Sequence, residues 1–390
     1  MSRADAAGYA RALGIMSGTS ADGVDAVLIR VERSLPPGRT VLLSSASRPY
    51  PDALRRRVLG AQEGTLPMRD LLALHVEVAE IAAATAREAL DAPEAKGPAP
   101  TVVGFHGQTV FHDPHGDRSG KRLSAQIGEP SVIAAALECP VVSNFRMADV
   151  LAGGEGAPLV PRFDYHQFAS AKRDRVLLNL GGIANLTRIP AGAGLGEVVA
   201  FDCGPGNMLL DGIMASQSSA GARFDAGGAI AAGGHVAEDV VRDFLSEPFF
   251  ARRPPKSAGR EDFGAGYLSR FLARTERLAL ADRLRTAAAL TAAAVAKGVE
   301  MSGKGAPKEV WVSGGGAKNE TLMAEIRARL RGSTVSSTES LGVPVGAKEA
   351  MAFAFLGLLT LMGRPGNVPS ATGATHEVVL GSITPPPKPR

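Results

Sequence analysis

The sequence predicts an α/β protein made of two related domains, and three observations lead to this class. Short apolar runs rich in Val, Ile and Leu alternate with helical patterns, which is the order of an α/β fold. A chain of 390 residues, of which 45% are hydrophobic, is long enough for about two sizeable cores. A strand, a polar Gly turn and a second strand occur in residues 12–31 and again in 175–189. We therefore expect two related domains that face a cleft, with a chance likeness of two hairpins as the alternative.

The apolar runs are predicted as strands because runs of this length and composition suit a buried sheet. They cover residues 11–15, 26–31, 40–44, 101–105, 141–143, 175–180, 185–189, 197–201 and 309–313. Helical spacing and many alanines predict long helices over 71–90, 282–299 and 348–362. A shorter helix over 320–330 follows a third Gly turn.

Composition excludes several classes of protein. The net charge is +4 and the densest basic cluster, Arg55–Arg57, is short, so nucleic-acid binding is not expected. Cys139 and Cys203 are too few for a disulfide framework, and their spacing does not suit zinc. The first fifteen residues lack the apolar core of a signal peptide, and the longest apolar run, 351–362, is too short to span a bilayer. We expect a cytoplasmic protein with no membrane partner.

The turn between the first two strands carries the clearest chemical signal. It contains Gly18, Thr19, Ser20 and Gly23, whose backbone and hydroxyl groups can approach phosphate oxygens. Carboxylates at 22 and 25 suit such a turn if a divalent cation lies between them and the phosphate. The turn therefore predicts a nucleotide-phosphate loop with magnesium, and an ordinary polar hairpin is the alternative.

The third Gly turn, WVSGGGAKN at 311–319, lies between a strand and a helix. Nucleotide-binding crevices use this order because the N–H groups of the helix start point at the ligand. The turn matches neither GxGxxG nor the GxxxxGK[ST] pattern.

Nine motifs in order resemble the anhydro-N-acetylmuramic acid kinases, members of the sugar kinase, heat-shock ATPase and actin superfamily. The resemblance runs from about Gly14 to about Gly381. The motifs are GIMSGTSADGVD (14–25), HGQTVFH (106–112), QIGEP (126–130), FRMADVLAGGEGAPLVP (145–161), NLGGIANLT (179–187), FDCGPGNMLLD (201–211), PPKSAGREDF (254–263), SGGGAKNETLM (313–323) and KEAMAFAFLG (348–357).

The resemblance implies two RNase H-like domains around an ATP-binding cleft, one formed by residues 1–140 with 345–382 and the other by 141–344. It implies ATP and Mg²⁺ as cofactors and a small anhydrosugar as substrate. It also allows a homodimer, since members of the family are often dimeric. In the family reaction, water opens the anhydro bridge of 1,6-anhydro-N-acetylmuramic acid and the freed O6 takes the γ-phosphoryl group. The product, N-acetylmuramic acid 6-phosphate, enters cell-wall recycling.

The motif matches transfer site residues by position. The expected catalytic base is Asp202, placed just after a strand, although it could instead cap the following turn. The expected nucleotide contacts are Gly18, Thr19, Ser20, Ala21, Asp22, Gly23, Val24, Asp25, Gly181, Gly182, Asn185, Gly204, Gly314, Gly315, Gly316 and Asn319. The expected sugar contacts are His106, Gln108, Thr109, Glu129, Asp149, Gly206 and Asn207, and the expected metal ligands are Asp22, Asp25 and Glu349.

Some assignments have a simpler alternative. Glu349 could only complement the dipole at the start of its helix. Lys256 and Arg260 could belong to a solvated loop, or Arg260 could reach a substrate carboxylate. The histidines at 106, 112 and 115 are read as hydrogen-bonding groups, since their spacing within one loop fits no common zinc pattern.

The chain departs from the family pattern near the presumed sugar side, at Asn144, Glu155 and Arg162–Asp164. These departures weaken the choice of sugar. A levoglucosan-type kinase acting on 1,6-anhydroglucose is therefore one rival, and an ATP-binding regulator of the same superfamily is another. Stimulation of ATP turnover by an anhydrosugar would separate the kinases from the regulator.

Overall fold

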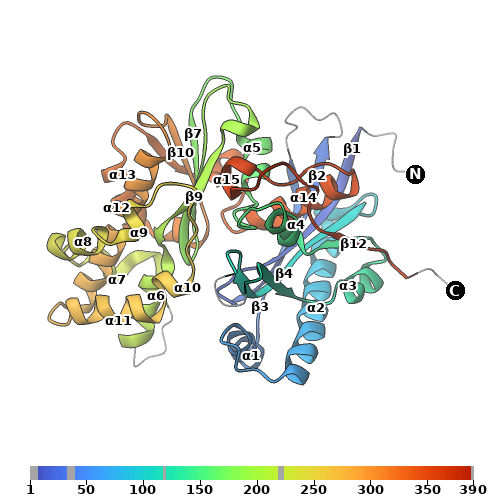
Figure 1. Ribbon diagram of the computed structural model, residues 1–390, viewed down its shortest axis with the longest axis horizontal. Helices are drawn as coiled ribbons and strands as arrows, with labels where there is room; N and C mark the ends of the chain where they lie inside the picture. Colours follow the sequence, from blue (N-terminus) through green and yellow to red (C-terminus); the bar gives the residue numbers. More distant parts are fainter. Residues whose placement is uncertain (1–7, 33–39, 117–119, 218–223, 388–390) are drawn as a thin grey trace. The chain divides into compact units, whose positions relative to one another are not determined.

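The computed structural model describes residues 8–32, 40–116, 120–217 and 224–387. The chain divides into two compact units, residues 1–168 with 347–390 and residues 169–346 (Figure 1). The first unit is discontinuous in sequence, and the second is one continuous segment.

The first unit contains a sheet with helices packed on it. Its strands are β1 (Tyr9–Ser17), β2 (Gly23–Glu32), β3 (Val41–Pro49), β4 (Val102–Asp113), β5 (Leu123–Ile127), β6 (Val141–Ser143) and β12 (Ser382–Thr384). Its α-helices are α1 (Asp52–Gln62), α2 (Met68–Asp91), α3 (Pro130–Leu137), α4 (Phe145–Leu151), α5 (Pro161–Phe168), α14 (Lys348–Leu361) and α15 (Pro369–Thr372).

The second unit has a smaller sheet and more helices. Its strands are β7 (Arg175–Leu180), β8 (Ile183–Ile189), β9 (Val199–Pro205), β10 (Glu309–Ser313) and β11 (Thr334–Ser337). Its α-helices are α6 (Asn207–Gln217), α7 (Ala229–Ala232), α8 (Glu238–Leu245), α9 (Pro248–Ala251), α10 (Arg260–Phe263), α11 (Ala265–Arg274), α12 (Leu280–Met301) and α13 (Glu320–Arg329).

The two sheets repeat one topology. In the first unit the order is β3-β2-β1-β4-β6-β12, with β5 paired to β4; the β1–β2 and β2–β3 pairs are antiparallel, and the β1–β4 and β4–β6 pairs are parallel. In the second unit the order is β9-β8-β7-β10-β11. Here the β7–β8 and β8–β9 pairs are antiparallel, and the β7–β10 and β10–β11 pairs are parallel. This is the order of an RNase H-like domain, so the prediction of two such α/β domains is confirmed.

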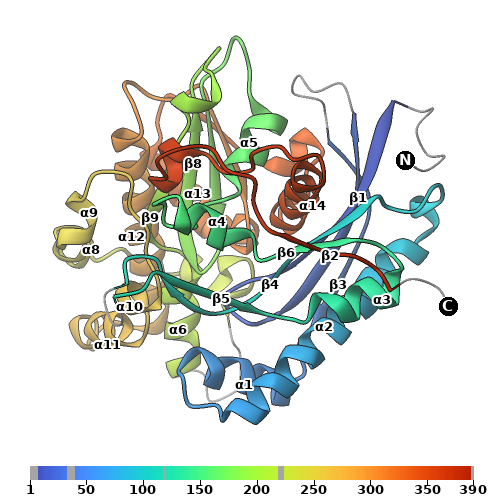
Figure 2. The same ribbon diagram turned by 45° about the vertical axis from the view of Figure 1, so that its right-hand side comes forward.

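Helix α14 lies unusually close to the first sheet, which it covers at β1, β2 and β4 (Figure 2). A Cβ at Gly14 would lie 1.9 Å from the carbonyl oxygen of Ala350, and a Cβ at Gly104 would lie 1.9 Å from that of Phe353. Only glycine permits such an approach of helix backbone to strand backbone. Leu13, next to Gly14 in β1, belongs to a hydrophobic cluster that also contains the buried residues of α2. Helix α2 packs on β2 and β3.

The long helix α12 lies at the centre of the second unit. It packs on β8 and β9 and also on α6, α7, α8 and α13. Five of its twelve buried positions are alanines, whose small side chains allow these neighbours to approach closely. At Gly298 an added Cβ would lie 2.6 Å from Cys203 Sγ, so α12 contacts the strand that carries Asp202.

The unit boundary differs from the predicted domain boundary. Residues 141–168, which we expected in the second domain, belong to the first unit. Strand β6 lies in the first sheet between β4 and β12, and α5 packs against α14, so this segment is held by pairing partners that sequence patterns do not identify.

The predicted long helices 71–90, 282–299 and 348–362 correspond to α2, α12 and α14 within a few residues at each end. Strands β5, β11 and β12 were not predicted. None of the helices in the described part of the chain combines the length and apolar composition that a bilayer crossing requires.

Candidate functional site

The β1–β2 turn of the first unit is shaped by side chains from outside it. The Ser17 hydroxyl lies 2.7 Å from Gln108 Oε1 and 2.8 Å from the carbonyl oxygen of Gly23, and the Tyr50 hydroxyl donates to it at 3.0 Å. Gln108 Nε2 donates to the carbonyl oxygen of Gly18 at 3.1 Å. The turn is therefore fixed at both ends.

Within this turn, Thr19 and Ser20 are exposed, whereas Ala21 is fully buried. Ala21 has a φ of +57°, and its N–H donates to the Gly18 carbonyl oxygen at 3.1 Å. A left-handed conformation is uncommon for a residue other than glycine. Gly23, Val24 and Asp25 already belong to β2, so the turn itself comprises residues 18–22.

The HGQTVFH segment lies inside β4, which corrects the strand predicted over 101–105 by extending it to Asp113. His106, Gln108 and Thr109 are buried residues of β4, and His112 is partly buried in the same strand. Burial holds the pKa of His106 well below its ordinary value and lowers the pKa of His112 to about 4, in both cases with help from the nearby positive charge of Arg146. Both imidazoles are therefore neutral at neutral pH.

Arg146 was not identified from the sequence, although it links three parts of the first unit. Its Nε donates to His106 Nε2 at 3.1 Å and its Nη1 donates to the Gly156 carbonyl oxygen at 2.8 Å. Its positive charge also offsets part of the rise that burial causes in the pKa of Glu349. Only the letters FR in the FRMADV motif could have indicated it.

Two of the three expected metal ligands interact with each other. Glu349, in the first turn of α14, has a raised pKa, first through burial and further through the negative charge of Asp25. The pKa of Asp25 is also raised by burial. Asp22 is different: its side chain is 71% exposed and lies 3.5 Å from Arg55. In the described ranges, no three His, Cys, Asp or Glu side chains group as a metal site.

A pair of partly buried, like-charged carboxylates fits a hard cation better than it fits an apolar core. Mg²⁺ usually keeps several waters and takes one or two carboxylates from the protein. Asp25 and Glu349 satisfy that requirement. Asp22 fits it less well, because Arg55 already neutralises its charge.

Asp149 does not fit the expected direct contact with sugar. It is fully buried: Oδ1 accepts from Asn367 Nδ2 at 2.8 Å and from Thr372 Oγ1 at 2.7 Å, and Oδ2 accepts from the Gly156 N–H at 2.8 Å. A carboxylate with this burial and these partners holds the 152–156 turn to the C-terminal segment.

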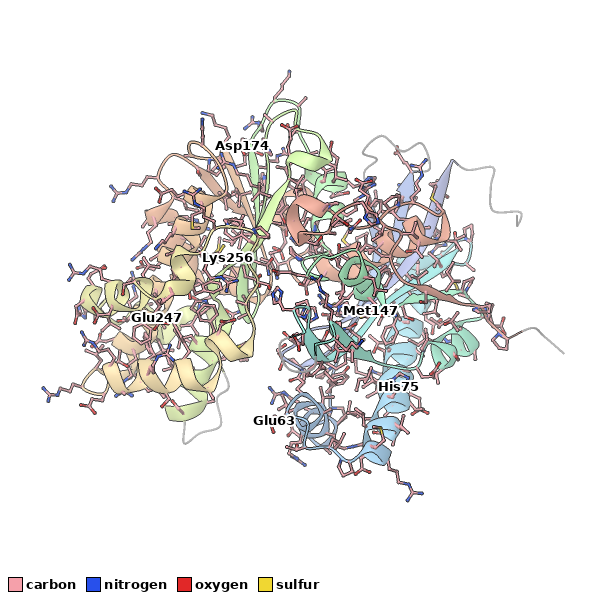
Figure 3. The ribbon with its side chains drawn as sticks, viewed as in Figure 1. Glu63, His75, Met147, Asp174, Glu247 and Lys256 are labelled. Atoms are coloured by element: carbon pink, nitrogen blue, oxygen red, sulfur yellow. The ribbon has the colours of Figure 1, made fainter. Side chains whose placement is uncertain are left out.

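Glu129 also has a local structural partner. It is the N-cap of α3, accepts from the Ser131 N–H at 2.9 Å and lies 3.3 Å from His75 Nε2, on α2 (Figure 3). The hydrogen bond from Ser131 lowers its pKa. A third of its side chain is still exposed, so capping leaves part of it accessible.

The Gly turns of the second unit pack backbone against backbone. The Gly206 N–H donates to the Gly182 carbonyl oxygen at 2.9 Å, and the Asn207 N–H donates to that of Gly181 at 2.8 Å. A Cβ at Gly206 would lie 2.3 Å from the Gly181 carbonyl oxygen. Gly206 and Asn207, expected as sugar contacts, therefore support the second phosphate-type loop through their main chains.

The third turn joins the same assembly. Asn207 Nδ2 donates to the Leu180 carbonyl oxygen at 3.0 Å, and a Cβ at Gly314 would lie 2.7 Å from that oxygen. Gly315 is exposed, and a Cβ at Gly316 would lie 2.6 Å from Leu180 Cβ. Asn319 caps α13 by accepting from the Leu322 N–H. The structure thus gathers the predicted Gly turns at 181–182 and 314–316, together with Gly206, at one end of the second sheet.

Asp202 lies within β9, not after it, at an irregularity in the strand pairing. It lies opposite Asn185, whereas the next pair along the register is Ala184 with Gly204, so one residue of β9 is extra. Such bulges redirect side chains and occur beside active sites. The carboxylate is partly buried, and its Oδ2 accepts from the Ala258 N–H at 2.8 Å.

The departures near the presumed sugar side have structural partners in the first unit. Asp164 forms a buried ion pair with Lys348, with Nζ to Oδ1 at 3.2 Å. Arg162 lies 3.5 Å from Glu377, and the carboxylate of Glu155 lies 3.7 Å from His115. Asn144 adopts φ +55°, a conformation that asparagine tolerates better than most residues. The local structure therefore explains these departures, and they do not require a substrate other than the anhydrosugar of the family pattern.

Comparison with known proteins decides the family. The family model described as anhydro-N-acetylmuramic acid kinase matches residues 10–386. The chain belongs to the anhydro-N-acetylmuramic acid kinase family. Relatives with that name share 45% identity in Synechococcus sp. (strain CC9605), covering 95% of this chain and 98% of the relative, and 40% in Gloeobacter violaceus, covering 96% and 98%. A relative in Salinibacter ruber is 42% identical and covers 96% of each chain.

Membership of the anhydro-N-acetylmuramic acid kinase family agrees with the resemblance that the nine motifs indicated. Because the match spans nearly the whole chain, it includes both units and each of the three Gly turns. A kinase family also supports ATP as the phosphoryl donor.

Proposed function

We propose that this chain opens 1,6-anhydro-N-acetylmuramic acid with water and phosphorylates its O6 from ATP. The products are N-acetylmuramic acid 6-phosphate and ADP, and the reaction serves cell-wall recycling. The observation that carries the proposal is the carboxylate of Asp202, which lies at a strand bulge in the unit where the Gly turns at 181–182 and 314–316 come together. The family match supplies the reaction class.

Asp202 is the proposed base. Its carboxylate takes a proton from water as the water oxygen bonds to the anomeric carbon, and the bond from that carbon to the bridging oxygen breaks. The freed O6 then bonds to the γ-phosphorus of ATP as the β–γ bridge oxygen leaves with ADP. The Ala258 N–H favours an ionised, oriented carboxylate, which a base requires.

The nucleotide contacts follow the Gly turns. We assign the phosphate chain to residues 18–25 and to Gly181, Gly182, Asn185 and Gly204, and the adenosine to Gly314–Gly316 and Asn319. Exposed hydroxyls at 19 and 20 and the exposed backbone at 315 support this assignment. Mg²⁺, when bound at Asp25 and Glu349, would neutralise charge on the transferred phosphoryl group.

The sugar contacts are proposed at the β4 edge and around α3, from His106, Gln108, Thr109 and Glu129. Thr109 supports this, because its Oγ1 is buried and has no hydrogen-bond partner among the residues that the structure describes. Asp149 enters the proposal as a residue that positions the 152–156 turn rather than as a contact. A cytoplasmic location and a homodimer are further proposals that rest on the family.

The test is mass spectrometry of the products formed from Mg-ATP with 1,6-anhydro-N-acetylmuramic acid, run in parallel with 1,6-anhydroglucose. A muramic product that has gained both water and a phosphoryl group supports the proposal. Turnover of anhydroglucose alone would assign the protein to levoglucosan-type kinases. ATP binding without any product would favour a regulator.

Asp202→Asn tests the base within the same assay. Removing a general base usually lowers turnover by about 10²–10⁴-fold. The matched control is Asp243→Asn, an exposed carboxylate on α8 of the same unit that pairs with Arg274. Equal turnover in both variants would remove Asp202 from the mechanism.

A further inference from the structure

Lys256 is buried in the second unit, although its sequence neighbourhood allowed a solvated loop. It lies beside β9 (Figure 3) and only 3% of it is exposed. Its Nζ donates to the Phe249 carbonyl oxygen at 3.2 Å and lies 4.5 Å from the centroid of the Phe249 ring and 5.7 Å from that of Phe201. Burying an ammonium is unfavourable, so lysines are rarely found in such places unless they are paired.

The backbone from Lys256 to Ala258 forms two hydrogen bonds with Asp202. The Asp202 N–H donates to the Lys256 carbonyl oxygen at 3.1 Å, and the Ala258 N–H donates to Asp202 Oδ2 at 2.8 Å. Residues 256–258 therefore bind both the main chain and the carboxylate of Asp202. Any displacement of that stretch moves the carboxylate.

The charges around Lys256 make Asp202 its anionic partner. The groups that face it are Asp202 and Cys203 on β9, Arg252 after α9, and Lys297 on α12. Burial raises the pKa of Cys203 far above neutral, so that thiol is uncharged. Arg252 and Lys297 are positive and repel the ammonium. Asp202 is thus the group among these four that attracts it.

We propose that Lys256 is a positioning residue for the reaction assigned to Asp202. Its anchored ammonium holds the 254–259 loop against β9, so that the loop orients the Asp202 carboxylate. Its positive charge favours the ionised form of that carboxylate, which is the form that accepts a proton from water. The inference rests on the proposed function, since it needs Asp202 to be the base.

The test compares Lys256→Met with Lys256→Arg in the full-length protein, using 1,6-anhydro-N-acetylmuramic acid and Mg-ATP. Methionine keeps the length of the side chain and removes its charge. We expect kcat to fall about 10- to 100-fold, KM for ATP to stay within about twofold, and the acid limb of the kcat–pH profile to move to higher pH by about one unit. Lys256→Arg should return the acid limb to its wild-type position.

Lys297→Met is the matched control. It removes a second lysine, on α12, whose positive charge acts on Lys256 and which lies outside the 254–259 loop, so kcat and the acid limb should stay as in the wild type. Thermal unfolding and ATP binding of each variant show whether the second unit is intact.

The outcomes separate the inference from the proposed function. A Lys256→Met protein with wild-type kcat and acid limb, while Asp202→Asn is inactive, overturns the role of Lys256 alone. An active Asp202→Asn overturns both. If Lys256→Met does not fold, Lys256→Arg decides: an acid limb that moves despite the retained charge refutes the inference, and an unmoved limb with a lower kcat supports it.

Discussion

The buried ion pair of Lys348 with Asp164 gives the sharpest stability prediction. It joins the first residue of α14 to α5, with Nζ 3.2 Å from Oδ1 and 3.3 Å from Oδ2. The two side chains are 4% and 1% exposed. Lys348→Met removes the ammonium and leaves the carboxylate of Asp164 inside the protein without it.

The magnitude follows from the separation and the burial. Unit charges 3.2 Å apart interact by about 5 kcal/mol at an effective dielectric constant of about 20. Removal of one partner from a buried pair costs about 3–5 kcal/mol, because the other charge loses both water and its counter-ion. We expect Lys348→Met to lower the free energy of unfolding by about 4 kcal/mol.

The assay is urea unfolding of four proteins: wild type, Lys348→Met, Lys348→Met/Asp164→Leu and Lys96→Met. Lys96 is an exposed lysine of the same unit, so its substitution should change the free energy of unfolding by less than about 0.5 kcal/mol. The double variant should recover most of the loss, because no buried charge is left.

Two results would refute this reasoning. If Lys348→Met unfolds at the same urea concentration as Lys96→Met, the ion pair of Lys348 with Asp164 does not contribute to the free energy of unfolding. If the double variant is no more stable than Lys348→Met, the loss comes from packing of the lysine and not from the abandoned charge.

Three further predictions concern the first unit. Gly104→Ala should cost about 3 kcal/mol or more, since its Cβ would lie 1.9 Å from the Phe353 carbonyl oxygen; equal unfolding temperatures of variant and wild type would contradict this. Between pH 6.5 and about 4, stability should fall with pH by up to about 1.4 kcal/mol per unit for each of His112 and His166, because their folded pKa of about 4 lies below the unfolded value and only the unfolded chain takes up protons there. Replacing both by asparagine should reduce the dependence of the urea midpoint on pH over that range, with His106 contributing to the slope that remains; an unchanged slope would contradict the prediction. Asp149→Asn replaces a carboxylate oxygen that accepts a hydrogen bond by an amide NH₂ group, so the substitution should lower the free energy of unfolding by about 2–4 kcal/mol. At low temperature, where the variant is folded, its KM for the sugar should equal that of the wild type. A large rise in that KM would show that Asp149 contacts the sugar.

The sequence was informative where structure depends on neighbours along the chain. Apolar runs and Gly turns predicted both hairpins, and helical spacing with many alanines predicted the long helices, because periodicity and turn chemistry are local properties. The predicted strand over 101–105 stopped short of His106, because the polar letters of HGQTVFH hide the continuation of β4. Pairing of β4 with β1 and β5 buries those polar residues, and pairing is not local.

The candidate site shows the same division. Family motifs placed Asp202 and the Gly turns, and the structure brings those of the second unit together. The burial of Lys256 could not be predicted, because it depends on Phe201 and Phe249, which pack around it only in three dimensions. The sequence also could not distinguish Asp149 as a buried anchor from Asp149 as a ligand, since both roles require a carboxylate.

The interruption of the first unit by the second has a consequence for folding during synthesis. The ribosome releases β1 and β4 long before it makes α14, so the backbone surface at Gly14 and Gly104 stays uncovered while residues 169–346 emerge. The second unit, continuous in sequence, can complete its core first. A chain that stops before residue 347 would expose a bare sheet face, whereas the final 44 residues, 347–390, close it. Premature termination between residues 319 and 347 is therefore a hazard for aggregation, even though it spares the Gly turns at 18–22, 181–182 and 314–316.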